Sequence, residues 1–133
     1  MAVLPPRRLG CEQCWPESAQ AASDNLFALV REAELIDESH YHVAIRRCAA
    51  CSQRFVWVFT ETIDWTGGND PQYWTLVPVT DQEATALRQA GAALSERELE
   101  ALPADRPSLQ RDWPASGTMR SYWGRGLWIG PHD

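Results

Sequence analysis

The feature that most constrains this chain is its four cysteines, which form two pairs with two residues between the members of each pair. The pairs are Cys11–Cys14 and Cys48–Cys51. This spacing is typical of a metal-binding turn, and each pair can place two thiolates on one tetrahedral ion at about 2.3 Å. Two such pairs complete the coordination sphere, so we expect one Zn²⁺ with no open position for water. Such an ion has a structural role and contributes to folding.

Other uses of these cysteines remain open from the sequence. The same four thiolates can hold an iron or iron–sulfur centre. A redox dithiol is less well supported, because neither pair lies in the βαβ context of a thioredoxin-like motif. Disulfides or free thiols are further alternatives, but we expect a cytoplasmic chain, in which disulfides are rare. This expectation rests on residues 1–10, where Arg7 and Arg8 precede no apolar stretch and no secretion signal is recognisable.

Between the two cysteine pairs, the spacing of apolar residues predicts a helix. It begins after Ser23 or Asp24, either of which is a suitable N-cap, and runs to about Glu38. After this segment the spacing changes to strict alternation, which is typical of strands. The three strands predicted in this way are 40–48, 55–63 and 73–79. Only the second cysteine pair separates the first two, so we expect them to pair antiparallel around a metal-binding turn.

These features resemble the zinc-ribbon class. The resemblance rests on the two cysteine pairs and on the strand Arg54–Val58 that follows the second, and it covers Cys11–Cys14 and about residues 40–79. It implies a three-stranded antiparallel sheet with zinc at one end. Thirty-three residues separate Cys14 from Cys48, whereas compact forms have about 15–20; the predicted helix accounts for the excess. The expected fold class is therefore α+β, with two or three helices packed on this sheet.

Two further helices are predicted after the third strand. Thr80 and Glu83 have the spacing of a capping box, in which each residue bonds the backbone amide of the other. We expect the helix that they start to end near Gly91, because glycine is favoured just past a helix. Ser95 and Glu98 repeat the same spacing and predict a second, short helix.

The last part of the chain is rich in proline, glycine and tryptophan and has no periodic pattern. We therefore divide the chain into a zinc-ribbon-like domain, 1–102, and an irregular segment, 103–133, docked on the body or on a partner. Trp123, Arg125 and Trp128 are candidate partner-binding residues, because tryptophan and arginine are enriched in interface hot spots. The alternative is that this segment folds back and covers the sheet.

The charge of the chain disfavours general nucleic-acid binding. The formal net charge is −6, and all 12 basic residues are arginine, whereas DNA-backbone binders normally carry a basic domain. Arg46, Arg47 and Arg54 nevertheless lie close to the second cysteine pair. They are the candidate residues for an alternative function as a nucleic-acid-binding zinc ribbon. They can equally serve to neutralise the thiolate-rich metal site.

No constellation of catalytic residues is evident. His40 and His42 are placed to share one face of a strand, and as metal ligands they would need carboxylate partners. Glu61 and Asp64 lie at the end of the aromatic strand, where they can serve acid–base chemistry or simply cap turn amides. There is no G-x-S-x-G, phosphate-loop or H-E-x-x-H motif. We expect no enzyme; a redox or metal-dependent enzyme is the alternative.

The sequence therefore predicts a small, non-catalytic, zinc-binding domain that acts in protein–protein interaction. Adaptors, accessory subunits and immunity or antitoxin-like proteins are examples, and an acidic protein of the last kind would complement a basic toxin. The composition is that of a globular protein, with 44% hydrophobic and 23% charged residues. No apolar run approaches the ~18 residues of a membrane-spanning helix, so no membrane association is expected.

Overall fold

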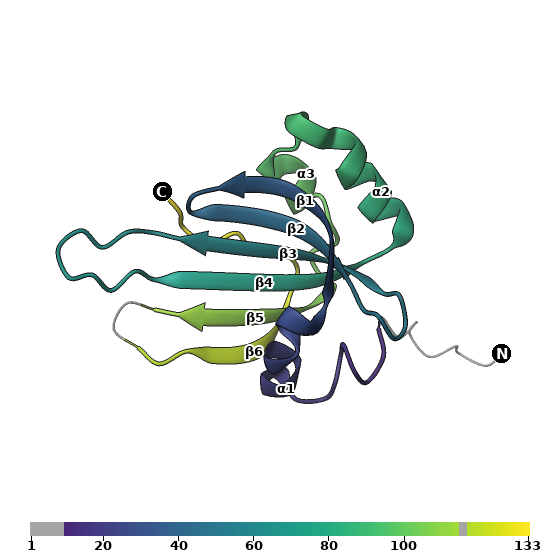
Figure 1. The fold of residues 1–133 in the computed structure, drawn as a ribbon, viewed down its shortest axis with the longest axis horizontal. Helices are drawn as coiled ribbons and strands as arrows, with labels where there is room; N and C mark the ends of the chain where they lie inside the picture. Colours follow the sequence, from purple (N-terminus) through teal and green to yellow (C-terminus); the bar gives the residue numbers. More distant parts are fainter. Residues whose placement is uncertain (1–9, 115–116) are drawn as a thin grey trace.

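The computed structural model describes residues 10–114 and 117–133, and in these residues six strands form one antiparallel sheet (Figure 1). The strands lie in the sheet in the order of the sequence, so that each pairs with the next. They are β1 Val30–Glu38, β2 Tyr41–Arg47, β3 Arg54–Glu61, β4 Gln72–Val79, β5 Pro107–Trp113 and β6 Arg120–Arg125. Antiparallel neighbours can be joined by short turns, and a turn of this kind between β2 and β3 holds the second cysteine pair.

The three strands predicted from alternation are confirmed as β2, β3 and β4. In β3, Phe55, Val56, Trp57 and Val58 are all buried, so both faces of the sheet are covered at its centre. The register places Val56 opposite both Ile45 of β2 and Val77 of β4. This central part of the sheet therefore sits within the core and provides a rigid base for the turn between β2 and β3.

The predicted fold class is wrong, because the sheet is larger and the helices are smaller than expected. We expected a three-stranded sheet with two or three helices packed on it; the described residues form six strands and only short α-helices. The α-helices are α1 Ala19–Asp24, α2 Asp81–Ala90 and α3 Glu96–Glu100, with 3₁₀ turns at η1 Leu26–Ala28 and η2 Gly91–Ala93. The three extra strands are β1, β5 and β6.

The segment predicted as a helix up to Glu38 is largely β1. Val30, Ala33 and Ile36 all occupy the same face, opposite Arg47, Ile45 and Val43 of β2. They are three residues apart because the register shifts twice, between Arg31 and Ala33 and between Glu34 and Ile36. Each β-bulge adds one residue to the two-residue repeat of a strand. The apolar residues consequently recur at a spacing that resembles a helix.

The segment predicted as irregular contains β5 and β6. Alternation is hidden in β5 because its buried side chains include Ser108, Gln110 and Asp112, which are exposed by 0%, 5% and 8%. These polar groups form bonds with one another and with neighbouring strands; for example, Gln110 Nε2 donates to Ser108 Oγ at 2.9 Å. A strand with a polar inner face cannot be recognised from hydrophobic alternation alone.

The helices cover the two faces of the sheet separately. The α1 face carries the buried residues Leu26, Leu29, Phe55, Leu76 and Leu109, together with Cys14 and Cys48. The α2–α3 face carries a second cluster of buried apolar residues: Val43, Ile45, Val56, Val58, Leu87 and Leu99. Both predicted capping boxes are confirmed, at Thr80–Glu83 and Ser95–Glu98. The two turns that carry the cysteine pairs therefore belong to the core of the α1 face.

The chain end, residues 126–133, returns across the α2–α3 face, and we refer to it as the C-terminal segment. Thr75 Oγ1 in β4 lies 2.8 Å from the carbonyl oxygen of Trp128. The ring of His132 stacks on Tyr41 with centroids 4.3 Å apart. The amide of Asp133 donates to the Glu61 carbonyl at 3.2 Å, and its carboxylate accepts from the Ile63 amide at 2.8 Å.

Candidate metal centre

The four cysteines come together at one end of the α1 face. Sγ of Cys11 lies 3.8 Å from Sγ of Cys14 and 3.8 Å from Sγ of Cys48. Sγ of Cys14 lies 3.7 Å from Sγ of Cys51, and all four sulfur atoms are within 4.8 Å of one another. These separations are far longer than a disulfide bond of about 2.05 Å, and all four cysteines are free thiols.

The arrangement of the sulfur atoms fits a single tetrahedral ion. Four thiolates at about 2.3 Å from a central ion lie about 3.8 Å from each other, the edge of a regular tetrahedron. The measured separations of 3.7–3.8 Å match this edge. The group is also partly enclosed, because Cys14 and Cys48 are buried and Cys51 is exposed. The four cysteines could therefore hold a metal ion.

The first cysteine pair is held by a tight turn. The amide of Trp15 donates to the carbonyl of Cys11 at 2.7 Å, and the amide of Cys11 donates to Sγ of Cys14 at 3.2 Å. Gly10 precedes the turn with φ = 90°, in the region that favours glycine. A Cβ on Gly10 would lie 2.9 Å from Sγ of Cys14. Glycine is therefore required here both by the backbone and by the close approach of the thiol.

The second cysteine pair is positioned by the hairpin between β2 and β3. The amide of Cys48 donates to the Gln53 carbonyl, and the amide of Ser52 donates to the Cys48 carbonyl, both at 2.9 Å. Ser52 has φ = 66°, which allows the chain to turn back sharply after Cys51. Because β2 and β3 are paired in register and largely buried, the turn has a fixed orientation relative to the sheet.

Burial and hydrogen bonding shift the pKa values of the thiols in opposite directions. Burial raises the pKa of Cys14 and also raises the pKa of Cys51. The backbone amide of Cys14, by hydrogen bonding, lowers the pKa of Cys11 to about 7. Four thiolates this close together repel one another, and a divalent ion would offset that repulsion and lower all of their pKa values.

The three arginines near the second cysteine pair do not form one exposed patch. Arg46 is only 4% exposed, and its guanidinium lies over the ring of Trp57, 4.6 Å from the centroid. Arg54 is held by Glu32, with bonds of 2.8 and 2.9 Å, and by Asp81 at 2.8 Å. Arg54 is therefore engaged with carboxylates on β1 and α2 rather than with the thiols.

The predicted histidine and carboxylate candidates lie apart from the cysteines. His42 has carboxylate neighbours, because its ligand atom and those of Glu34 and Asp37 lie within 4.8 Å of one another, an exposed arrangement that could hold a metal ion. Nδ1 of His40 lies 3.0 Å from Oε1 of Glu61, at the end of β3. His42 is in β2, with its Nδ1 3.1 Å from Oδ1 of Asp37 on the exposed edge of the sheet. The carboxylate of Asp64 accepts the amides of Thr66 and Gly67 at 3.1 and 2.8 Å, and these bonds lower its pKa.

The three candidate partner-binding residues do not lie together. Trp123 projects from β6 on the α1 face, where its ring lies 4.7 Å from that of Trp15. Trp128 belongs to the C-terminal segment on the opposite face and makes an edge contact with Tyr73, with centroids 5.1 Å apart. Arg125 is exposed at the end of β6, opposite Pro107 of β5. The sheet therefore separates Trp123 from Trp128.

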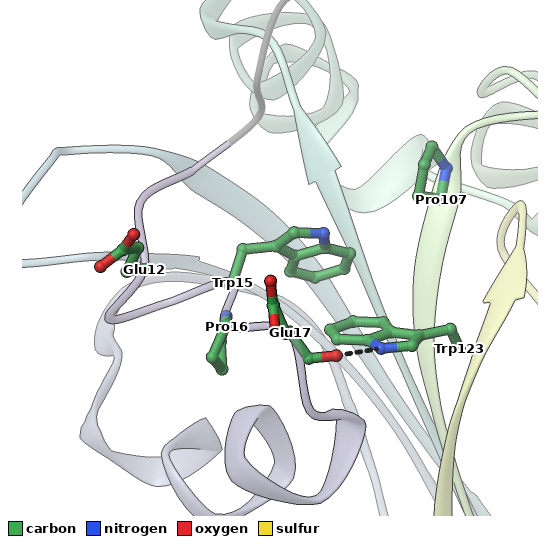
Figure 2. A pocket seen from close by; sticks show the side chains of 6 residues that line it. All are labelled: Glu12, Trp15, Pro16, Glu17, Pro107 and Trp123. Atoms are coloured by element: carbon green, nitrogen blue, oxygen red, sulfur yellow. Dashed lines mark hydrogen bonds between the residues drawn. The ribbon is translucent and has the colours of Figure 1, made fainter.

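A surface groove beside the cysteines was not predicted from the sequence. We call it the tryptophan groove; it has a volume of about 860 Å³ and is lined by Glu12, Trp15, Pro16, Glu17, Pro107 and Trp123. Figure 2 shows the two indoles side by side, with Nε1 of Trp123 donating to the carbonyl of Glu17 at 2.9 Å. Trp15 directly follows a cysteine in the sequence, which is the one signal that could have placed it here.

Among residues 10–114 and 117–133, no helix has the length and apolar character needed to cross a membrane. None of the family models, curated proteins or solved structures compared with this chain matches it.

Proposed function

We propose that this chain is a non-catalytic zinc-binding domain that acts in protein–protein interaction. The observation that carries the zinc part is the spacing of the sulfur atoms, 3.7–3.8 Å along three edges of the cysteine group. This spacing is that of one tetrahedral ion with four thiolate ligands. A cluster of several iron atoms would hold its thiolates farther apart, so the geometry favours a single ion.

The proposed role of the ion is structural. Four protein thiolates fill the coordination sphere of zinc, and no position is left for a water molecule or a substrate. The ion would join the Cys11–Cys14 turn to the β2–β3 turn, which are 37 residues apart in the sequence. Zinc binding of this kind contributes to the free energy of folding, because the unfolded chain has no formed site.

The interaction part of the proposal is supported by the tryptophans. The chain has seven, and four of them are substantially exposed in the structure. The exposed fractions are 89% for Trp65, 48% for Trp113, 42% for Trp128 and 37% for Trp123. Tryptophan is the residue most enriched in interface hot spots, because it contributes a large contact area with few rotatable bonds.

The first experiment is the metal content of protein purified without added metal, by elemental analysis and native mass spectrometry. We expect one zinc per chain. One iron per chain, or no metal with four reactive thiols, would contradict the zinc proposal and favour the redox alternative. Cys48→Ser is expected to lose the ion, whereas Ala49→Ser, in the same turn and exposed, should keep it.

A further inference from the structure

The tryptophan groove has the chemistry of a site for a cationic side chain. Its apolar surface is provided by the indoles of Trp15 and Trp123 and by Pro107 on the β5 side (Figure 2). The carboxylates of Glu12 and Glu17 are exposed beside them. An aromatic surface next to carboxylates attracts a cation in two ways: the electron-rich ring faces make cation–π contacts, and the carboxylates form ion pairs.

The two carboxylates are available for a ligand. Among the described residues, no side chain forms an ion pair or a hydrogen bond with the carboxylate of Glu12 or of Glu17. The acidic character extends to the whole chain, whose net charge is −6. A basic partner would therefore be attracted to this surface before contact.

The groove is also rigid before any ligand binds. The ring of Trp123 is fixed by its bond to the Glu17 carbonyl, 2.9 Å, and by its contact with Trp15. Trp15 stacks on the buried ring of Phe55, with centroids 5.8 Å apart, and its amide bonds the Cys11 carbonyl. Aromatic groups fixed in this way lose little entropy on binding, which favours affinity.

We propose that the tryptophan groove binds an arginine side chain of a partner protein. The guanidinium lies on the indoles and pairs with Glu12 and Glu17. Arginine fits better than lysine, because a planar guanidinium stacks on an aromatic face and can bond a carboxylate through two N–H groups. This proposal rests on the interaction part of the proposed function and identifies the chemistry of the partner.

The metal site and the groove share one turn. Glu12 lies between Cys11 and Cys14, and Trp15 directly follows Cys14. An ion held by the two cysteines would therefore fix the backbone that carries Glu12 and Trp15. We therefore infer that arginine binding depends on the metal, although the ligand does not touch the ion. Loss of the metal should abolish binding even where the rest of the sheet remains folded.

The test uses the metal-loaded protein and a synthetic hexapeptide with two arginines, matched to a peptide in which both are citrulline. Binding is followed by NMR of the indole N–H signals up to about 5 mM peptide, a range that detects weak affinity. Trp15→Phe and Trp123→Phe assign the two signals. We expect the arginine peptide alone to shift both signals, with lysine weaker. No shift, or equal shifts with citrulline, would overturn the proposal.

Charge and ring variants sharpen the test. Glu12→Gln with Glu17→Gln, and separately Trp123→Ala, should each weaken binding about tenfold or more. Glu38→Gln with Glu100→Gln makes the same change in net charge at exposed positions outside the groove. This control should change the affinity less than about twofold in 0.15 M salt. Equal weakening by the two double variants would show that the peptide is attracted only by the net charge of the protein. That result would overturn the proposal of a specific arginine site.

Two arginines of this chain give further outcomes. Arg125 lies opposite Pro107 in the sheet, so Arg125→Ala should leave binding unchanged or tighten it; a loss would indicate an anionic ligand and overturn the proposal. Removing Arg7 and Arg8 should also leave affinity unchanged; a rise above about tenfold would show that the chain's own arginines fill the groove. Zinc content is measured on every sample, so a failed zinc assignment is distinguishable from a failed arginine site.

Discussion

The turn at Cys11–Cys14 and the C-terminal segment both hold a part of the chain against the sheet, but they do so with different forces. At the turn, four sulfur atoms meet within 4.8 Å at a position suited to one ion. The C-terminal segment is held instead by separate contacts along its length, from Thr75 with Trp128 to Ile63 with Asp133. A single ion is either bound or lost, whereas distributed contacts can be lost one at a time. We therefore expect an all-or-none response at the turn and a graded response at the segment.

The largest expected effect is that of metal removal. Cys14→Ser, or chelation of the unmodified protein, should lower the free energy of unfolding by more than about 3 kcal/mol, because the formed site exists only in the folded chain. For a chain of this size the Tm should fall by roughly 10 °C or more. Thermal unfolding followed by circular dichroism, with and without chelator, measures the change.

Hydrogen exchange locates the same effect. After chelation, amide protection should fall first in residues 10–29 and remain over the C-terminal segment, 126–133. An equal loss of protection in both regions would show that residues 10–29 and the C-terminal segment unfold as one cooperative unit. It would contradict the expectation that they are held independently.

The next effect concerns the glycine that precedes the first cysteine. Gly10→Ala should cost about 2–4 kcal/mol, since alanine is strained at φ = 90° and its Cβ would lie 2.9 Å from Sγ of Cys14. Zinc affinity, measured by competition with a chelator, should fall along with stability. Gly68→Ala is the control, because Gly68 also has a positive φ but a Cβ there meets nothing within 4 Å. Equal loss of zinc in both variants would show that backbone strain alone lowers zinc affinity and that the close approach of the Cβ to Sγ of Cys14 has no effect.

The matching change at the other end is Gly130→Ala. A Cβ there would lie 2.5 Å from Oγ1 of Thr60 and 3.1 Å from the side chain of Tyr73. Overpacking of this kind should cost about 1–3 kcal/mol and displace the C-terminal segment from the sheet. Zinc content should be unchanged, which native mass spectrometry checks. Loss of zinc in this variant would mean that the two ends are coupled through the sheet.

The parts of the molecule that could be predicted are those in which neighbouring residues determine the structure. The spacing of the cysteines predicted that all four would come together in one group, as they do in the structure. Strict alternation of apolar residues predicted β2, β3 and β4. In β1, two bulges give Val30, Ala33 and Ile36 a helix-like spacing, and in β5 the inner face is polar at Ser108, Gln110 and Asp112. Neither strand has the hydrophobic period that identifies strands in a sequence.

The position of Trp15 after Cys14 was a signal for one wall of the tryptophan groove, but its pairing with Trp123 could not have been predicted, because that contact is long-range. Trp15 and Trp123 are more than 100 residues apart and meet only because β6 follows β5 at the edge of the sheet near α1. The same sheet order separates Trp123 from Trp128, which are only five residues apart in the sequence. From the sequence, Trp123 and Trp128 were expected to form one binding surface because they lie close together in the chain. In the structure, the chain crosses from one face of the sheet to the other between them.

The smallest effect concerns the ion pair between Glu32 and Arg54, at the end of the sheet that carries the second cysteine pair. The carboxylate of Glu32 in β1 accepts both Nε and Nη2 of Arg54, and the guanidinium lowers the pKa of this carboxyl. A lowered pKa in the folded state means that the pair stabilises the fold above the unfolded pKa of about 4.3 and that this contribution is lost as the pH falls below it. Glu32→Gln should therefore cost about 0.5–1 kcal/mol at pH 7.

Urea unfolding of the unmodified protein and Glu32→Gln, from pH 7 down to pH 3, measures this contribution. The difference between the two should shrink as the pH falls below about 4.3, because the Glu32 carboxyl is then protonated in the unfolded chain and, at still lower pH, in the folded chain as well. Glu34→Gln is the control, since Glu34 is more exposed and lies 3.4 Å from Arg31. A difference that stays constant with pH would show that Glu32 acts through packing and not through its charge. The same difference in unfolding free energy between the unmodified protein and Glu32→Gln should persist in metal-free protein, because Arg54 binds carboxylates and not thiols. The ion pair between Glu32 and Arg54 would then still hold the edge strand β1 to β3 when the ion is absent.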